Sequence, residues 1–359
     1  MESFEKILSV IVPAYNMEAY LPKCLSSLVI DDKQLLRKLD VIVVNDGSKD
    51  RTSEIAHEFE VKYPDVFRVV DKSNGNYGSC VNVALLIASG VFVKILDADD
   101  SFDTNAFTQM LYSLVESECN SEKLDLLLTD FVKVDEVGKD IDIHRVQLSA
   151  NTVFTVRDIK KMPLLYMHSI TYRMENLRRI GYRQTEGISY TDNEWIFYPM
   201  QTVKTVKYVP LPVYRYLLGR VGQTVDPSVI KKSTWVMAVI AERINSESEK
   251  LLTNVSAPVL RKYLKHIIIM MNEKVYNGVI LDLHSQEDDK RLVMFDNRFE
   301  AMAPEMHKCV INLLVSHKMR FRYGIYWRHY HSSNVLGLRL FRVYIFLIRF
   351  ISNFLHRHR

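Results

Sequence analysis

The stretch Val91-Phe-Val-Lys-Ile-Leu-Asp-Ala-Asp-Asp-Ser-Phe102 decides how the rest of the chain is interpreted. Its first half, Val91–Leu96, is an apolar run containing β-branched residues, a pattern that predicts a buried central strand. This strand leads directly into Asp97, Asp99 and Asp100. Bare carboxylates are costly to bury, so these three must be paired, hydrated or bound to a cation.

Two of these acids, Asp97 and Asp99, should point the same way, because side chains two residues apart on an extended chain share a face. Neighbouring carboxylates repel each other unless a cation lies between them. Hard divalent cations suit such oxygen ligands and also accept a phosphate. The alternative is a helix N-cap, since Asp-Asp-Ser often precedes an apolar helix. An isolated Asp-x-Asp favours the cap, whereas the surrounding chain favours the metal.

Length and composition indicate a globular enzyme. The chain has 359 residues, enough for one large domain and a smaller one, and 48% of them are hydrophobic. Its four cysteines, Cys24, Cys80, Cys119 and Cys309, form no CxxC pair. This spacing indicates a reducing compartment and argues against structural zinc. The first residues lack the basic start and apolar core of a signal peptide.

Charge is distributed unevenly along the chain. Residues 306–359 contain ten Lys or Arg and no Asp or Glu, which leaves 37 basic and 43 acidic residues before them, a net charge of −6. A basic tail on an acidic body indicates an anionic surface as partner. No nucleic-acid-binding motif accompanies the tail, so we expect no nucleic-acid partner.

The last stretch, Val335–Arg359, predicts a basic amphipathic helix. At 100° per residue its polar side chains fall on one stripe: Arg339, Arg342, Arg349, Asn353 and His356. Its longest apolar run, 343–348, is far shorter than the ~20 residues of a membrane span. We therefore expect a helix lying in the plane of the cytoplasmic face of the membrane. The alternative is a helix that docks on the core or joins subunits of a homo-oligomer.

The first hundred residues alternate between strand and helix patterns. Leu8–Pro13, Asp40–Asn45 and Val66–Val70 read as strands, followed by helices at about 18–28, 51–63 and 80–88. This rhythm predicts an α/β fold with a mostly parallel sheet flanked by helices. Ligands bind at the carboxyl ends of such strands. Four polar loops should meet there: Pro13–Asn16, Asn45–Ser48, Lys72–Gly78 and Asp97–Asp100.

The first of these loops distinguishes between nucleotide chemistries. Dinucleotide-binding sheets and sugar-nucleotide pyrophosphorylases need glycines after the first strand, and Pro-Ala-Tyr-Asn has none. The phosphates must then be neutralised elsewhere, and a metal on Asp99 is the candidate. Tyr15 could stack on a base and Asp46 could accept a hydrogen bond from a uracil-like N–H. Core packing of Tyr15 and a tight turn at Asp46 are equally compatible with the sequence.

Four motifs in order carry a family resemblance: Val-Ile-Val-Pro-Ala-Tyr-Asn16, Val-Val-Asn-Asp-Gly-Ser-Lys-Asp-Arg-Thr52, Lys-Ser-Asn-Gly-Asn-Tyr-Gly-Ser-Cys-Val-Asn82 and Leu-Asp-Ala-Asp-Asp-Ser-Phe102. Across about residues 7–220 the chain resembles family 2 glycosyltransferases of the GT-A fold, of the bacterial cell-surface polysaccharide or teichoic-acid type. The resemblance implies a UDP-sugar donor, with Asp97 on the nucleotide and Asp99 on Mn²⁺ or Mg²⁺. It also implies a nucleoside site formed by Pro13, Ala14, Tyr15, Asn16 and Asp46, with Lys72 and Asn74 nearby.

The resemblance also implies a catalytic base in Ser-Tyr-Thr-Asp-Asn-Glu-Trp195. The usual Glu-Asp pair of the motif is Thr191-Asp192 here, so Asp192 is the expected base and Glu194 the second choice. A helix cap at Asp192 is the alternative. One carboxylate suffices, because it removes the proton of an acceptor hydroxyl as that hydroxyl attacks. A single displacement inverts the anomeric centre, and nothing in the chain suggests a second nucleophile for a retaining route.

Two further residues have open roles. Pro-Leu-Pro-Val-Tyr-Arg-Tyr-Leu-Leu-Gly-Arg-Val-Gly-Gln-Thr224 resembles a stretch of bacterial polymer-decorating members. Arg220 in it could reach a diphosphate or an anionic acceptor, or be a surface arginine beside a glycine turn. His168 either lines the acceptor side or is a hydrogen-bonded structural histidine.

Residues 229–316 show apolar positions at helical spacing and predict a small helical domain. The expected organisation is a catalytic domain at 1–220, a helical domain at 221–334 and the amphipathic helix at 335–359. The expected activity is transfer of a hexosyl or N-acetylhexosaminyl group to a saccharide or lipid-linked acceptor. The alternatives are a sugar nucleotidyltransferase and a membrane scaffold that keeps a catalytically dead domain.

Overall fold

The computed structural model describes residues 6–120, 123–220, 223, 233–283 and 285–313, with short segments at 315–316, 321–322, 343–344 and 346–347. The chain divides into two compact units. The first comprises Met1–Gln223 with Ala257–Leu260, and the second comprises Thr224–Ser256 with Arg261–Arg359. The predicted amphipathic helix at 335–359 lies outside the described residues except for 343–344 and 346–347.

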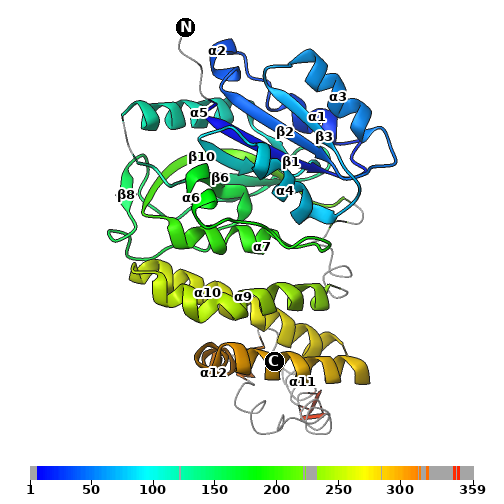
Figure 1. The fold of residues 1–359 in the computed structure, drawn as a ribbon, viewed down its shortest axis with the longest axis vertical. Helices are drawn as coiled ribbons and strands as arrows, with labels where there is room; N and C mark the ends of the chain where they lie inside the picture. Colours follow the sequence, from blue (N-terminus) through cyan, green and yellow to red (C-terminus); the bar gives the residue numbers. More distant parts are fainter. Residues whose placement is uncertain are drawn as a thin grey trace, which may run out of the picture. The chain divides into compact units, whose positions relative to one another are not determined.

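The first unit is built on one mixed ten-stranded sheet with the main strand order β3-β2-β1-β4-β9-β6-β10-β5, where β7 pairs with β6 and β8 with β10. Its elements, in chain order (Figure 1), are β1 Leu8–Ala14, α1 Leu21–Ser26, α2 Lys33–Leu36, β2 Leu39–Asn45, α3 Thr52–Lys62, β3 Phe67–Asp71, α4 Asn76–Ile87, β4 Phe92–Ile95, β5 Ser101–Phe102, α5 Thr104–Cys119, β6 Leu126–Val134, β7 Asp140–His144, β8 Val153–Thr155, η1 Met167–Ser169, β9 Ile170–Arg173, α6 Met174–Arg179, α7 Asp192–Trp195, η2 Tyr198–Thr202 and β10 Thr205–Leu217.

Four neighbouring strands, β3, β2, β1 and β4, run parallel, as the sequence predicts. Every residue of β1 and β2 is buried, which explains why these strands are continuous apolar runs rather than alternating ones. The next strand, β9, is antiparallel to both β4 and β6. The carboxyl ends of the four parallel strands therefore lie at one edge of the sheet and carry the predicted polar loops.

The end of β1 differs from the prediction. The strand does not stop at Pro13 but continues to Ala14, and these residues pair with Val44 and Asn45 of β2. Pairing between β1 and β4 has already ended at Ile11. Proline is tolerated where a strand loses one neighbour, because no ladder hydrogen bond depends on its missing N–H.

Helices cover the sheet (Figure 1). Val10 and Val12 of β1 belong to the same buried cluster as Leu25 of α1, Ile55 of α3 and Leu111 of α5. Alternate residues of a strand share a face, so this cluster marks the face that α1, α3 and α5 cover. The buried apolar residues of α1, α3 and α5 therefore form one layer of helices packed on this face of the sheet.

Helix α4 begins at Asn76, four residues before the predicted start at Cys80. Its first residues, Asn-Tyr-Gly-Ser, are weak helix formers, so local propensity favours the predicted loop. Tertiary packing overrides it at Gly78, where an added Cβ would lie 2.1 Å from the carbonyl oxygen of Thr185. Only glycine allows the helix to approach this loop so closely.

The second unit is helical where the structure describes it, as predicted. It contains α9 Thr234–Asn254, α10 Pro258–Asn277, η3 Gly278–Asp282, α11 Gln286–Met302 and α12 Pro304–Leu313, with a short pair β11 Val315–Ser316 and β12 Phe321–Arg322. Pro258 and Pro304 occupy first helical positions, where a missing N–H costs nothing. Asp296 of α11 contacts Tyr276 of α10 and His307 of α12. This buried carboxylate therefore joins three helices.

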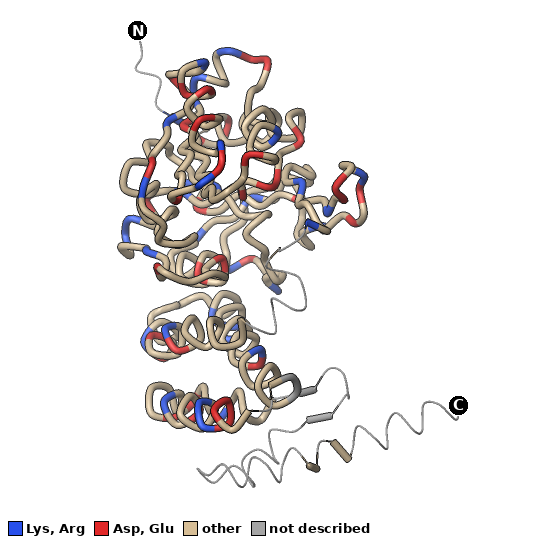
Figure 2. The backbone as a smooth tube through the Cα atoms, turned by 90° about the vertical axis from the view of Figure 1, so that its right-hand side faces the viewer, with Lys and Arg blue, Asp and Glu red and all other residues tan. Residues whose placement is uncertain are grey.

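The helices of the second unit carry interspersed acidic and basic positions (Figure 2). None of the described helices combines the length and the apolar character needed to cross a bilayer.

Candidate active site

The loop after β1 and the Asp-Gly-Ser turn after β2 form one hydrogen-bonded corner. Asn16 N donates to Ser48 Oγ at 3.0 Å, and Lys49 N donates to Asn16 Oδ1 at 2.8 Å. Asn16 adopts φ +53° and Gly47 φ +73°, a region that a non-glycine residue rarely occupies without a reason. Tyr15 is 46% exposed. Its ring is not a core residue and remains available for stacking.

Asp46 is the centre of this corner and is buried. Its Oδ1 accepts hydrogen bonds from Lys72 Nζ at 2.5 Å and from Gly75 N at 2.9 Å. Asn74 Nδ2 donates to the carbonyl oxygen of Asp46 at 3.1 Å. The structure thus brings together the three residues Asp46, Lys72 and Asn74, which the sequence places in two separate loops.

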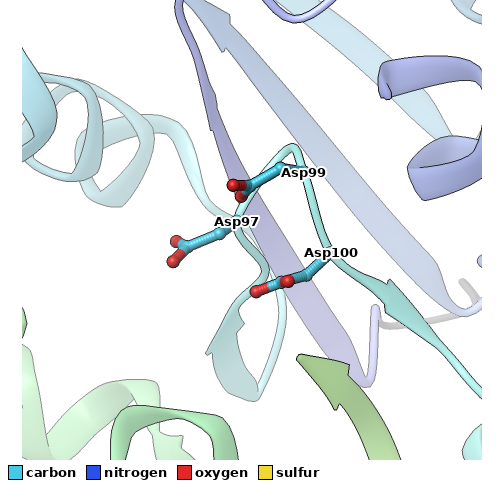
Figure 3. Close-up of side chains that lie close together, drawn as sticks. All are labelled: Asp97, Asp99 and Asp100. Carbon is cyan, nitrogen blue, oxygen red and sulfur yellow. The ribbon is translucent and has the colours of Figure 1, made fainter. Parts of the chain in front are cut away.

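The three acids after β4 converge (Figure 3). Asp97, Asp99 and Asp100 each offer a carboxylate oxygen, and these oxygens lie within 4.8 Å of one another. The convergence of Asp97 and Asp99 is confirmed, but its predicted cause is wrong. The strand ends at Ile95, and Asp100 N donates to the carbonyl of Asp97 at 2.9 Å. A tight turn rather than an extended chain gathers the acids, and it adds Asp100 to the group.

Burial and mutual repulsion disfavour the ionised form of the carboxylates in this acid turn. Burial, and then the neighbouring Asp99, raise the pKa of Asp97 to about 7. Burial, followed by Asp99 and Asp97, also raises the pKa of Asp100 well above its usual range. Carboxylates in this state gain most from a bound cation, so the residues present fit a hard divalent metal.

Two tyrosines, the half-buried Tyr77 and the buried Tyr214, hold the acid turn. Tyr77 OH donates to Asp97 Oδ1 at 2.8 Å, and Tyr214 OH donates to Asp100 Oδ2 at 2.7 Å. Tyr214 OH also accepts a hydrogen bond from Asp97 N at 3.1 Å. The sequence analysis assigned these tyrosines no role, although both stand within motifs that it quoted. The sequence clue to each tyrosine is its place in a motif. Tyr77 directly precedes Gly78, and Tyr214 is the first residue of Tyr-Arg-Tyr.

Arg220 reaches the same turn. Its Nε donates to Asp99 Oδ2 at 2.9 Å, and its guanidinium lies 5.7 Å from the ring centre of Tyr20. The side chains of this ion pair are only 23% and 12% exposed, so Arg220 is not a surface arginine. The guanidinium thus lies beside the acid turn, where its positive charge favours an anionic group such as a diphosphate.

Asp192 begins α7 and lies close to the acids. Its charge contributes to raising the pKa of Asp97 and of Tyr77. The preceding Tyr190 adopts φ +66°, and its carbonyl accepts a hydrogen bond from Asn193 Nδ2 at 2.8 Å. A left-handed tyrosine is strained, and such strain concentrates at functional sites. The expected base therefore lies within electrostatic reach of the acid turn.

Glu194, the second choice for the base, is fully buried. Its two carboxylate oxygens accept hydrogen bonds from Thr185 N and Thr185 Oγ1, both at 2.7 Å. The adjoining Gln184 N donates to Asn82 Oδ1 of α4 at 2.8 Å. Glu194 therefore holds a loop against α4, and Asp192 is the more accessible of the two carboxylates.

His168 lies among aromatic rings. In the part of the chain that the structure describes, its Nδ1 is buried without a hydrogen-bond partner, which does not fit a hydrogen-bonded structural histidine. Burial, and then the nearby Lys94, lower the pKa of His168 to about 3. The imidazole is therefore neutral at physiological pH.

Comparison with known proteins agrees with this geometry. Residues 9–122 match the family described as Glycosyl transferase family 2. Residues 9–122 are a glycosyltransferase family 2 domain. Over 195 residues the chain is 27% identical to EpsJ of Bacillus subtilis (strain 168), an uncharacterized glycosyltransferase, with 52% of this chain and 54% of EpsJ covered.

One further relative and one solved structure extend the comparison. The chain is 34% identical over 110 residues to the minor teichoic acid biosynthesis protein GgaB of Bacillus subtilis (strain 168), covering 31% of this chain and 12% of GgaB. A crystal structure of S. aureus TarS residues 1–349 with UDP-GlcNAc superposes with a TM-score of 0.63 at 20% identity. That match covers 94% of this chain and 90% of the TarS chain. The glycosyltransferase domain therefore has the GT-A fold, and the chain spans about half the length of EpsJ.

Proposed function

We propose that this chain is a metal-dependent inverting glycosyltransferase that moves a sugar from a UDP-sugar to a hydroxyl of a saccharide or lipid-linked acceptor. One observation carries the proposal. The corner around Asp46 and the acid turn both follow the carboxyl ends of parallel strands of one sheet, and Asp192 is close enough for its charge to help raise the pKa of Asp97.

The donor is proposed to bind at the corner formed by Pro13–Asn16 and Asp46. Tyr15 offers an exposed ring for stacking on the base. Asp46 offers a carboxylate whose position is fixed by Lys72 and Gly75. The structure of TarS with UDP-GlcNAc, a protein of the same fold, supports a UDP-sugar as the class of donor.

The diphosphate is proposed to lie over the acid turn. Asp99 would hold Mn²⁺ or Mg²⁺, which stabilises the charge of a departing diphosphate when bound, and Asp97 would contact the nucleotide. Tyr77 and Tyr214 keep the carboxylates in place by donating hydrogen bonds to Asp97 and Asp100. Arg220, at present on Asp99, is long enough to offer its remaining donors to a phosphate oxygen.

Asp192 is proposed to be the base. Its carboxylate accepts the proton of the acceptor hydroxyl while that oxygen forms a bond to the anomeric carbon and the bond to the diphosphate breaks. Attack from the side opposite the leaving group inverts the anomeric centre. Glu194 cannot share this task in the observed arrangement, because Thr185 engages both of its oxygens.

A calorimetric screen tests the proposal. UDP, GDP and CMP, each with and without Mn²⁺, are titrated into the full chain, and UDP-sugar hydrolysis is followed without acceptor. The expected result is metal-dependent binding of UDP and slow hydrolysis of one UDP-sugar. A sugar nucleotidyltransferase would instead release diphosphate from a nucleoside triphosphate. A dead scaffold would bind UDP and hydrolyse nothing.

The basic terminal segment is proposed to hold the enzyme on the cytoplasmic face of an anionic membrane. Each basic residue near such a surface contributes about 1 kcal/mol, and salt screens this attraction. Full-length protein should float with vesicles rich in acidic lipid, less so at high salt. Removal of residues 335–359 should abolish flotation and leave UDP-sugar hydrolysis intact. If removal instead splits an oligomer on a sizing column, the segment is an assembly element.

A further inference from the structure

Six rings form a continuous row that begins at the molecular surface and ends at the acid turn. We call it the aromatic row; it runs from His144 and Tyr166 through Phe131 to His168, which contacts both Tyr216 and Tyr214. His144 lies 4.8 Å from both Tyr166 and Phe131, centre to centre. Phe131 lies 4.8 Å from His168, which stacks on Tyr216 at 4.4 Å.

The inner end of the row reaches the reacting groups. Tyr214 donates its hydroxyl to Asp100 and lies 4.6 Å from His168. The acids Asp100, Asp97 and Asp99, and also Asp192, contribute to raising the pKa of Tyr216 after burial. Tyr216 is therefore within electrostatic reach of both the metal-binding acids and the expected base.

The outer end of the row is accessible. Tyr166 is 41% exposed, and His144 and Tyr216 are half-buried. Exposed aromatic rings beside a reaction centre need a reason, since burial would otherwise stabilise them. Nδ1 of His168, in the middle of the row, is a buried polar atom without a partner among the described residues.

A buried lysine fixes the row. Lys94 of β4 is fully buried, and its Nζ donates to the carbonyl oxygens of His168 at 2.7 Å and Ile170 at 3.1 Å. The same Nζ lies 5.9 Å from the ring centre of Tyr214. Lys94 thus pins the short helix η1 that carries His168 and stands beside the tyrosine that holds Asp100. A long cationic side chain in a central strand is costly, and here it serves to order the row.

We propose that the aromatic row is the acceptor-binding surface and that its ligand is a sugar ring. The proposal rests on the function proposed above and specifies its acceptor. One face of a pyranose presents several C–H groups, which are apolar and positively polarised, and these suit the negative face of an aromatic ring. The row would lead such a ring toward Asp192.

The charge around the row favours a sugar ring over a polyol phosphate chain. A repeating phosphate needs unpaired cations along its path. Two basic side chains near β7 are already paired with acids of that strand: Lys133 with Asp142 at 3.1 Å, and Arg215 with Asp140 at 2.8 Å. The row itself contributes only neutral rings, because burial keeps His168 uncharged.

Saturation-transfer NMR on the full chain, with UDP and Mg²⁺ present, tests the proposal. The probes are methyl β-N-acetylglucosaminide and methyl β-galactoside, with ribitol 5-phosphate as the polyol phosphate. The variants are Tyr166→Ala, Tyr166→Phe and, as a matched control, Tyr112→Ala. Tyr112 is a comparably exposed tyrosine on α5, hydrogen-bonded to Asp32 at 2.6 Å and outside the row.

At least one saccharide should receive saturation on its ring protons. Its affinity should fall about three- to tenfold in Tyr166→Ala and stay close to the wild-type value in the other two variants. Equal affinity in Tyr166→Ala, stronger binding of ribitol 5-phosphate than of every saccharide, or no saccharide signal from the wild type would each overturn the proposal. UDP affinity, titrated separately, should be unchanged throughout. If the wild type does not bind UDP, the proposed donor site is wrong, but the result on the aromatic row still holds.

Discussion

The proposed donor side and the proposed acceptor side of this sheet edge are built differently. On the donor side, Asn16, Asp46 and Lys72 are fixed by hydrogen bonds between neighbouring loops. On the acceptor side, His168 and Tyr216 are fixed mainly by ring packing. A rigid polar frame suits a ligand that is always the same, such as a nucleotide. An apolar, partly exposed surface can accept sugars that differ in the arrangement of their hydroxyl groups.

The largest expected effect is on the donor side, where one charge should be essential. Asp99→Asn should abolish transfer and remove the Mn²⁺ dependence of UDP binding, because it deletes the charged metal ligand. Calorimetric titration of UDP with and without Mn²⁺ measures this. Asp103→Asn is the matched control, since Asp103 belongs to the same segment but caps α5 through Ala106 N. Equal metal dependence in Asp99→Asn and the wild type would remove Asp99 from the site.

The next effect is at the base, between the two sides. Asp192→Asn should leave UDP-sugar binding nearly intact and lower turnover by roughly 10²–10⁴-fold, the usual contribution of general-base catalysis. Steady-state kinetics with saturating donor measures it. Glu194→Gln should instead lower thermal stability, because Glu194 is buried on Thr185. Retained turnover in Asp192→Asn together with a dead Glu194→Gln would exchange the two roles.

A smaller effect is expected where the two sides meet. Tyr214→Phe removes a hydroxyl that contacts both Asp100 and Asp97 N. Because it only supports the metal-binding acids, Mn²⁺ affinity should fall about tenfold or slightly more. Tyr208→Phe is the control. Tyr208 lies on β10, as Tyr214 does, and its OH donates to the buried Asp130 Oδ1 of β6 at 2.9 Å. Both variants should lose similar amounts of stability, and only Tyr214→Phe should lower the affinity for Mn²⁺. A matching Mn²⁺ loss in Tyr208→Phe would show a general effect of destabilisation.

The two sides also differ in how far the sequence predicts them. The donor side is predictable because its residues lie in contiguous motifs after successive strands, and parallel strands bring those motifs to one edge. The partners of the acceptor side are far apart in sequence: Tyr214 meets Asp100 across 114 positions. No local pattern specifies such a pair, so the sequence shows Tyr214 and Tyr216 only as parts of the Tyr-Arg-Tyr motif.

The errors have the same physical origin. Helix α4 was predicted to start at Cys80 because Asn-Tyr-Gly-Ser favours a turn, and the close approach of Gly78 to Thr185 overrides that preference. Asp100 was given no role because alternation along a strand separates it from Asp97, whereas the actual turn gathers the two. In both cases tertiary contact decides a local conformation that propensity leaves open.

The smallest expected effect tests how far the polar frame of the donor side extends. His57 lies between Asp71 and Glu60, with each ring nitrogen 2.8 Å from a carboxylate oxygen. Asp71 also accepts Asn45 Nδ2 at 2.7 Å, and Asn45 is the last residue before Asp46. Hydrogen bonds to Asp71 and then to Glu60 raise the pKa of His57. Protonated His57 should therefore steady the corner that holds the nucleoside.

The sign of the pH dependence follows from this shift. A raised pKa in the folded state means that the stabilisation is fully present below the unfolded value near 6.5 and is lost as pH rises through the folded value. His57→Gln should thus lower the free energy of unfolding at about pH 5.5 and have little effect at about pH 8.5. The loss should stay below about 1 kcal/mol, because the group is largely exposed. Urea unfolding at both pH values measures it. If the loss of unfolding free energy in His57→Gln does not shrink with rising pH, His57 acts by packing. The hydrogen-bonded network of the proposed donor side would then extend no further than Asp71.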